Sequence, residues 1–189
     1  MTAIDLDWQG PYPLSDMGLQ APKADDRTGV YLVIQQISRG PDVFVGSSTN
    51  LGFRFRAHIQ AVLGLNTYIR RDNGSRHPKD SPVTQFWTRV SNLAAEVELC
   101  LRALDATSFA WAEAPREHIG AIEALIYASL MSHQKKGLIL VSNIARVPRV
   151  GAFEETQLTH AGSRPVVELL AQGAAPVGPA EDKPAGSPA

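Results

Sequence analysis

Apolar residues in the first half of the chain follow a pattern typical of paired strands. Residues 29–37 (GVYLVIQQI) are rich in β-branched and aromatic side chains, and the turn-forming run SRGPD at 38–42 ends them. A second short apolar run follows at 43–45 (VFV). Two such runs joined by a turn predict an antiparallel hairpin.

Two later segments repeat apolar residues at helical spacing. The first follows Asn50, a residue type that caps helices, and is expected to end near Gly64. Its apolar positions are Leu51, Phe55, Ile59 and Val62. The second covers residues 114–133, begins with Pro115 in its first turn, and is expected to end before Gly137. Its apolar positions are Ile119, Ile122, Ile126 and Leu130.

The segment between these two predicted helices is less regular. Residues 66–82 are polar and contain glycine and proline, which predicts a surface loop. Residues 96–104 (EVELCLRAL) alternate imperfectly between polar and apolar, so we expect a third strand that includes Cys100. Residues 138–141 form a brief apolar segment. Together the elements predict an α+β fold with a small three-stranded, mostly antiparallel sheet flanked by helices.

The ends of the chain lack this regularity. Residues 1–26 contain three prolines and five aspartates, and we interpret them as an irregular acidic leader before a domain at 27–150. Residues 151–172 are expected to be an extension with a possible short helix capped by Ser163. The Ala, Pro and Gly-rich residues 173–189 are predicted to be disordered, because they have too few large apolar side chains to offset the entropy of ordering.

Composition favours a soluble protein that is not exported. No run approaches the roughly 18 to 20 apolar residues that span a bilayer, and the first ten residues do not resemble a signal peptide. Cys100 is the only cysteine, which excludes an internal disulfide and a thiolate metal cage. The expected location is therefore the cytoplasm, with no membrane association.

The net charge of −1 hides an uneven distribution. Residues 1–26 hold one Lys against five Asp, and residues 151–189 hold two basic against five acidic residues. Residues 27–150 therefore carry fifteen Lys and Arg against nine Asp and Glu. Clustered positive charge is what contact with nucleic acid phosphates requires, although charge also fluctuates along chains without such a role.

Two tripeptides and four dispersed residues form a recognisable pattern along the chain. The tripeptides are Gly29-Val30-Tyr31 and Phe44-Val45-Gly46. Arg54 and His58 follow in the predicted helix, Glu123 lies in the later helix, and Asn143 follows in Ser-Asn-Ile-Ala. This pattern resembles the GIY-YIG nuclease superfamily, most closely the catalytic domains of its phage homing endonucleases, in which the two tripeptides are the name-giving motifs. The resemblance covers roughly residues 28–147 and implies a metal-dependent nuclease.

The chemistry of three of these residues agrees with that implication. Arg54 and His58 are four apart and share a helix face, and a guanidinium suits the charge of a phosphate transition state. Glu123 is expected to ligate one Mg²⁺ or Mn²⁺, with waters and a phosphate oxygen completing the coordination. The alternative for Glu123 is a salt bridge to Arg116 or Arg54.

The resemblance implies roles for two further residues. Tyr31 is expected to act near the attacking water, as a phenolate base or as the group that orients it, with His58 accepting the proton. A phenolate requires the Tyr31 pKa to fall from about 10. Asn143 is expected to hold the site's geometry. Phe44 departs from the family pattern, because it replaces a tyrosine and lacks the hydroxyl.

We therefore expect an endonuclease that hydrolyses DNA phosphodiester bonds with low sequence specificity, acting as a monomer or homodimer. The alternative is a DNA-binding module that keeps the fold without catalysis. RNA or branched DNA as the substrate stays open. The basic loop supplies candidate DNA contacts, namely Arg70, Arg71, Arg76 and Lys79. The other histidines (His77, His118, His133 and His160) lack metal-ligand spacing and are interpreted as surface residues.

Overall fold

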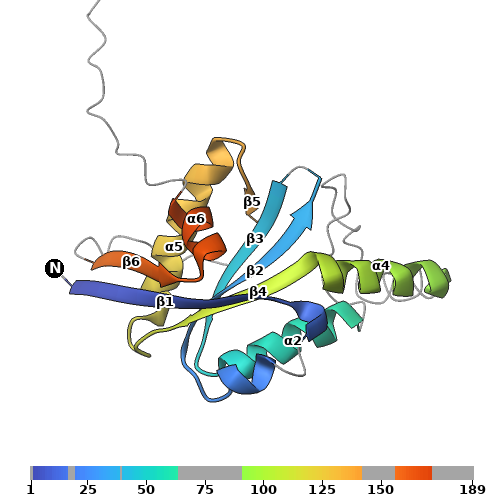
Figure 1. Ribbon diagram of the computed structural model, residues 1–189, viewed down its shortest axis with the longest axis horizontal. Coiled ribbons are helices and arrows are strands. Elements are labelled where there is room, and N and C mark those ends of the chain that lie inside the picture. Colours follow the sequence, from blue (N-terminus) through green and yellow to red (C-terminus); the bar gives the residue numbers. More distant parts are fainter. Residues whose placement is uncertain (1, 17–19, 39, 64–90, 142–155, 172–189) are drawn as a thin grey trace, which may run out of the picture.

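The computed structural model describes residues 2–16, 20–38, 40–63, 91–141 and 156–171, which build a curled mixed sheet with helices on both faces (Figure 1). Its strands are β1 (Thr2–Pro13), β2 (Gly29–Ile37), β3 (Gly40–Ser48), β4 (Thr107–Glu113), β5 (Leu140–Val141) and β6 (Thr156–Gly162). Its helices are α2 (Leu51–Leu63), α4 (Leu93–Ala106), α5 (Ile119–Lys135) and α6 (Arg164–Ala171), with short 3-10 helices η1 (Leu14–Asp16) and η2 (Ala21–Ala24).

The sheet has six strands in the described residues, in the order β5-β3-β2-β4-β1-β6. Neighbours from β3 to β1 are antiparallel, whereas β5 runs parallel to β3 and β6 runs parallel to β1. The prediction of a small three-stranded sheet is therefore wrong. The hairpin expected at residues 29–45 is present as β2 and β3, at the centre of a wider sheet.

The prediction of a strand at residues 96–104 is also wrong, because this segment lies in helix α4. Its buried residues are Cys100, Ala103 and Leu104, which fall on one side of a helix rather than alternating. The strand that pairs with β2 comes directly afterwards, at Thr107–Glu113. This strand is buried on both faces, so it lacks the polar and apolar alternation that marks a half-exposed strand.

Residues 1–26 were expected to be irregular, but they contain strand β1. This strand lies between β4 and β6 in the sheet and pairs with both. Ile4, Leu6 and Trp8 are buried, and the two aspartates between them are exposed, so the period of two is clear once the pairing is known. The extension at 151–172 likewise contains β6 and the short helix α6, whose Val166 and Leu170 pack in the core with β1. Ser163 precedes this helix, but its hydroxyl makes no hydrogen bond and does not cap it.

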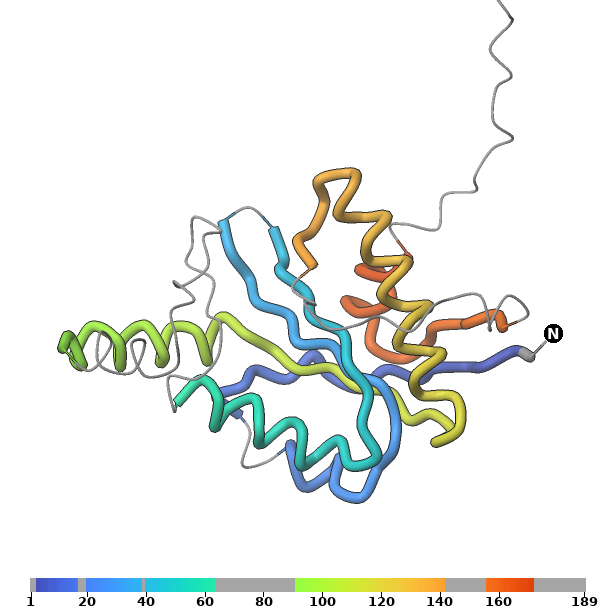
Figure 2. Tube along the Cα trace, turned by 180° about the vertical axis from the view of Figure 1, so that it is seen from behind, coloured from blue at the N-terminus to red at the C-terminus, as the bar shows by residue number. Residues whose placement is uncertain are grey.

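Two apolar clusters pack against opposite faces of the sheet. Helices α5 and α6 lie on one side of the sheet, and α2 and α4 lie on the other (Figure 2). The first cluster contains buried residues of α5 and α6 together with residues of β2 and β3, and the second contains buried residues of α2 and α4. Adjacent residues of β2 belong to different clusters: Val30 faces α5, and Tyr31 faces α2. Among the described residues, no helix is long and apolar enough to span a membrane.

Candidate active site

The β2–β3 hairpin sets Tyr31 opposite Gly46 in the strand register. The phenol lies against this glycine, since a Cβ added to residue 46 would overlap the Cζ and Oη atoms of Tyr31. Gly46 therefore leaves the space that the Tyr31 hydroxyl fills. The other motif glycine, Gly29, has a packing role, since a Cβ there would overlap the carbonyl oxygen of Ala112 in β4.

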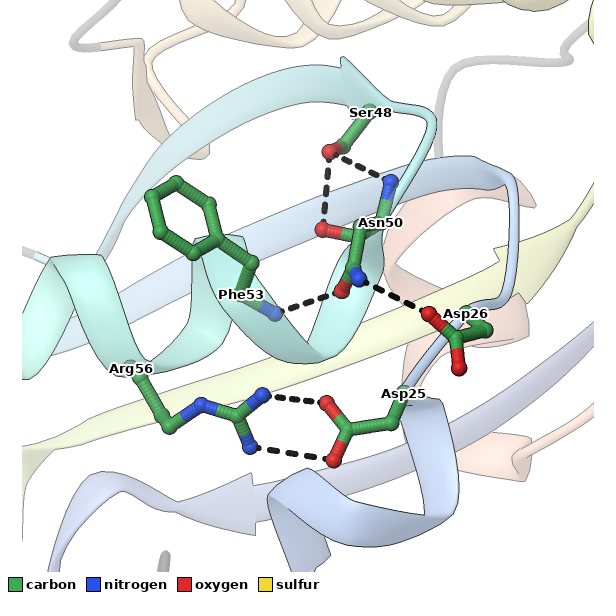
Figure 3. Close-up of polar contacts among 6 residues, drawn as sticks. All are labelled: Asp25, Asp26, Ser48, Asn50, Phe53 and Arg56. Atoms are coloured by element: carbon green, nitrogen blue, oxygen red, sulfur yellow. Dashed lines mark hydrogen bonds and ion pairs between the residues drawn. The ribbon is translucent and has the colours of Figure 1, made fainter.

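Helix α2 is anchored firmly at its first turn (Figure 3). The Asn50 side chain accepts a hydrogen bond from the backbone N–H of Phe53 at 2.8 Å, which makes it the cap that the sequence predicts. The Asn50 amide also donates to Asp26 at 3.2 Å, and both Arg56 nitrogens bind the carboxylate of Asp25. These contacts tie the segment before β2 to α2 and fix the helix relative to the hairpin.

Arg54 projects from α2 to the Tyr31 hydroxyl, with 3.2 Å between Nη2 and Oη. Tyr31 is fully buried. Burial raises the pKa of the phenol, and it outweighs the lowering effect of the Arg54 charge and hydrogen bond, while the Glu123 carboxylate raises the pKa further. The lowered pKa that a phenolate base needs is not found, so Tyr31 is a neutral phenol at pH 7.

His58 lies one turn after Arg54 and contacts the same tyrosine. Its ring meets Tyr31 edge-on at a centroid distance of 5.4 Å, and it meets Phe44 in the same manner at 5.7 Å. Burial, together with the Arg54 charge, lowers the His58 pKa to about 4. His58 is therefore neutral at pH 7, and its buried Nε2 atom has no hydrogen-bond partner.

Phe44 and Phe109 complete the aromatic surroundings of the phenol. Phe109 stacks on Tyr31 at a centroid distance of 5.1 Å and continues the stack to Phe55 at 4.2 Å. Phe44, the residue in place of the second motif tyrosine, stacks at 6.2 Å from Tyr31. Phe44 therefore lies within the site, beside both Tyr31 and His58.

Glu123 reaches the same region from the opposite face of the sheet. Helix α5 packs over β3, and the Glu123 carboxylate accepts a hydrogen bond of 2.6 Å from the Ser47 hydroxyl. None of the ion pairs among the described residues involves Glu123, so the alternative salt bridge to Arg54 or Arg116 is not formed. The carboxylate is nevertheless close enough to Tyr31 to influence its pKa.

The donor set at Glu123 fits a hydrated divalent cation. It offers one half-buried carboxylate next to a hydroxyl, and Mg²⁺ commonly takes one or two carboxylates and keeps several waters. The described part of the chain contains no group of three His, Cys, Asp or Glu side chains that could enclose a metal ion. A closed structural metal site is therefore not formed by these residues, whereas an open site built on Glu123 agrees with the side chains present.

The structure thus brings together Tyr31, Phe44, Gly46, Arg54, His58 and Glu123. Asn143 and the predicted DNA contacts Arg70, Arg71, Arg76 and Lys79 lie outside the described residues. The sequence reasoning missed Ser47 and Phe109, which touch the site directly. Ser47 directly follows Gly46 of the second tripeptide, and this position was the feature of the sequence that could have indicated its role. His133, interpreted as a surface residue, is instead fully buried.

Comparison of the chain with protein-family models, with curated proteins and with solved structures gave no significant match. The resemblance to GIY-YIG nucleases therefore rests on the order and spacing of residues in the sequence alone.

Proposed function

We propose that this protein is a metal-dependent endonuclease that hydrolyses DNA phosphodiester bonds with little sequence specificity. The observation that supports this most directly is the contact of 3.2 Å between Arg54 and the Tyr31 hydroxyl, with the His58 ring against the same phenol. The Glu123 carboxylate is near enough to raise the Tyr31 pKa. These residues come from β2, α2 and α5, and they combine a phosphate-binding group, a neutral base and a carboxylate ligand.

Arg54 is the group suited to the scissile phosphate. The Arg54 residue is exposed, and its Nη2 atom donates a hydrogen bond to the Tyr31 hydroxyl. The other guanidinium nitrogens are therefore available to bind two phosphate oxygens. The fixed positive charge stabilises the negative charge that accumulates as water attacks phosphorus. Because the phenol is buried and neutral, we assign Tyr31 to orienting Arg54 and the water, rather than to acting as a phenolate.

His58 is the base in this proposal, because its imidazole is neutral at pH 7 and lies against the Tyr31 phenol, where it can accept the proton that the attacking water loses. The new bond joins the water oxygen to phosphorus, the bond to the 3′ oxygen breaks, and the departing 3′ oxygen takes a proton from solvent water. The products are a 5′-phosphate and a 3′-hydroxyl. Glu123 would hold the Mg²⁺ or Mn²⁺, which supplies charge neutralisation at the departing oxygen.

DNA as the substrate is supported by the excess of basic residues in 27–150. A non-catalytic DNA-binding module is the competing proposal, and two observations favour it. Phe44 contributes no hydroxyl to the site, and the Tyr31 pKa is raised rather than lowered. Binding and cleavage must therefore be measured separately.

The test is cleavage of supercoiled plasmid by purified protein with Mg²⁺, Mn²⁺ or EDTA, alongside a filter or gel assay of DNA binding. Glu123→Gln and Arg54→Ala are expected to lose cleavage. Matched controls are Glu98→Gln and Arg102→Ala, which remove the same side chains from an exposed pair on α4. Metal-dependent cleavage at many positions, lost only in the first two variants, supports the proposal. Binding without cleavage under any metal would leave the binding module as the better account.

A further inference from the structure

We infer that Ser47 is a positioning residue that holds the Glu123 carboxylate in the orientation needed to ligate a divalent cation. This inference rests on the proposed function, because it concerns the same metal site. Its evidence is separate, however, since it comes from one hydrogen bond and from the geometry of one strand.

The hydrogen bond from the Ser47 hydroxyl to Oε2 of Glu123 is 2.6 Å long. That length is typical of a hydroxyl donating to an ionised carboxylate, which is among the stronger protein hydrogen bonds. Both side chains are half-buried, so water competes with the bond less than it does at a fully exposed position. One carboxylate oxygen is therefore held, and Ser47 leaves the other, Oε1, to a cation.

Strand β3 explains why the serine is at this position. Successive residues of a strand face opposite sides of the sheet. Gly46 lies beneath the Tyr31 phenol on the α2 face, and Ser47, opposite Val30 in the register, faces α5. Two consecutive residues of β3 therefore contact site residues on opposite faces of the sheet. Gly46 leaves space for the Tyr31 phenol, and Ser47 hydrogen-bonds the Glu123 carboxylate.

Among the described residues, the Ser47 hydroxyl is the group that hydrogen-bonds the Glu123 carboxylate. Glu123 forms no ion pair within that part of the chain. Without the serine hydroxyl, the carboxylate loses the contact that fixes its rotation.

The test is direct titration of the full-length protein with Mn²⁺, followed by the electron paramagnetic resonance signal of free Mn²⁺, without DNA. Ser47→Ala is expected to bind Mn²⁺ roughly tenfold more weakly, because hydrogen-bond partners of metal ligands typically contribute about 10-fold to 100-fold in affinity. Ser47→Thr keeps the hydroxyl and suits a strand, so it should restore binding. Glu123→Gln should abolish binding.

Ser132→Ala is the matched control, because Ser132 lies on the same helix as Glu123 and its hydroxyl bonds only the backbone oxygen of Ser129. A second readout is the Mg²⁺ concentration for half-maximal DNA cleavage. It should rise in Ser47→Ala, with much of the lost rate recovered at saturating Mg²⁺.

The outcomes separate the two proposals. Weaker Mn²⁺ binding by Ser47→Ala in a protein that never cuts DNA supports the role of Ser47 and contradicts the nuclease. Cleavage with an unchanged Mg²⁺ midpoint in Ser47→Ala contradicts the role of Ser47 and leaves the nuclease intact. If the unaltered protein neither binds Mn²⁺ nor cuts DNA, both proposals are overturned.

Discussion

The phenol of Tyr31 lies directly over Gly46, where even a methyl group would overlap its Cζ and Oη atoms. Gly46 thus gives the phenol the space in which its hydroxyl meets Arg54. The geometry makes the glycine as necessary to the site as the groups that carry charge.

Gly46→Ala is expected to displace Tyr31 and destabilise the protein by about 1 to 3 kcal/mol, the usual range for an overpacked core. Cleavage should fall with it, because Arg54 loses its partner. Urea denaturation at pH 7 measures the stability change. Gly120→Ala is the control: a Cβ there meets nothing within 4 Å, and Ala suits helix α5 better than Gly. Equal stability of the two variants would contradict the contact.

Arg54→Lys is expected to lose roughly 100-fold in cleavage rate, close to the loss in Arg54→Ala. Lysine keeps the charge, but it lacks the planar fork that can bind Tyr31 and phosphate together. Initial rates of plasmid nicking at saturating Mg²⁺ measure this, with Arg102→Lys as the matched control. Near-normal activity of Arg54→Lys would show that charge alone is needed.

His58 should make the protein less stable in acid. Its pKa in the folded protein is about 4, below its ordinary value of 6.5, so the unfolded chain binds a proton that the folded protein does not. Its contribution is complete above pH 6.5 and is lost as the pH falls toward 4, by about 3 kcal/mol.

The measurement is the free energy of unfolding in urea at pH 7 and pH 4.5, for the unaltered protein and for His58→Gln. The variant should lose distinctly less stability between the two pH values. Carboxylates and the two other histidines with lowered pKa values, His133 and His160, contribute equally to both proteins and cancel in the comparison. Equal losses in the two proteins would mean that folding does not lower the pKa of His58, so that the folded protein and the unfolded chain protonate this residue alike.

Asn50→Ala is expected to destabilise the protein by about 1 kcal/mol, because it removes the side-chain oxygen that caps α2. Asn50→Ser should retain most of the stability, since serine is also a good cap. Asn92 occupies the corresponding position of α4 without a side-chain cap bond, so Asn92→Ala should cost little. Thermal or urea unfolding of the three variants measures the difference, and a similar loss at both asparagines would argue against the cap.

Phe44→Tyr is expected to increase the cleavage rate by up to about tenfold, the effect of one additional hydrogen bond of about 1.4 kcal/mol. The ring is 5.7 Å from His58, so a hydroxyl there enters the site without a change in the aromatic packing. Single-turnover cleavage at saturating Mg²⁺ measures it. Unchanged rates would show that the hydroxyl is not missed at this position.

Much of the hairpin and of the two principal helices follows from the sequence, because their signals are local. Asn50 caps α2 through the N–H of a residue three positions later, and Leu51 and Phe55 are buried one turn apart. The strand at residues 29–37 was expected where it lies. The helix around Glu123 was expected to begin at 114, with Pro115 in its first turn, but it begins at Ile119, so that part of the prediction is wrong. The residues of the candidate site could be named because their order and spacing resemble those of a known family, and helical spacing then puts Arg54 and His58 on one face of α2.

Other elements carried ambiguous local signals. The segment at 96–104 has nearly equal claims to a strand and a helix, and only packing of Cys100, Ala103 and Leu104 against the sheet selects the helix. The alternation of Ile4, Leu6 and Trp8 was present in the sequence, but the prolines and aspartates around it outweighed that pattern.

The sequence by itself determined the hairpin, the cap and spacing of α2, and the kinds of chemical group that the chain offers, because each depends on residues a few positions apart. Only the tertiary structure decided that residues 2–8 pair in parallel with residues 156–162, and that Glu123, on the opposite face of the sheet, lies near enough to Tyr31 to raise its pKa. Strand partners and side chains so distant in sequence are selected by the burial that the whole fold makes possible, which no local pattern encodes.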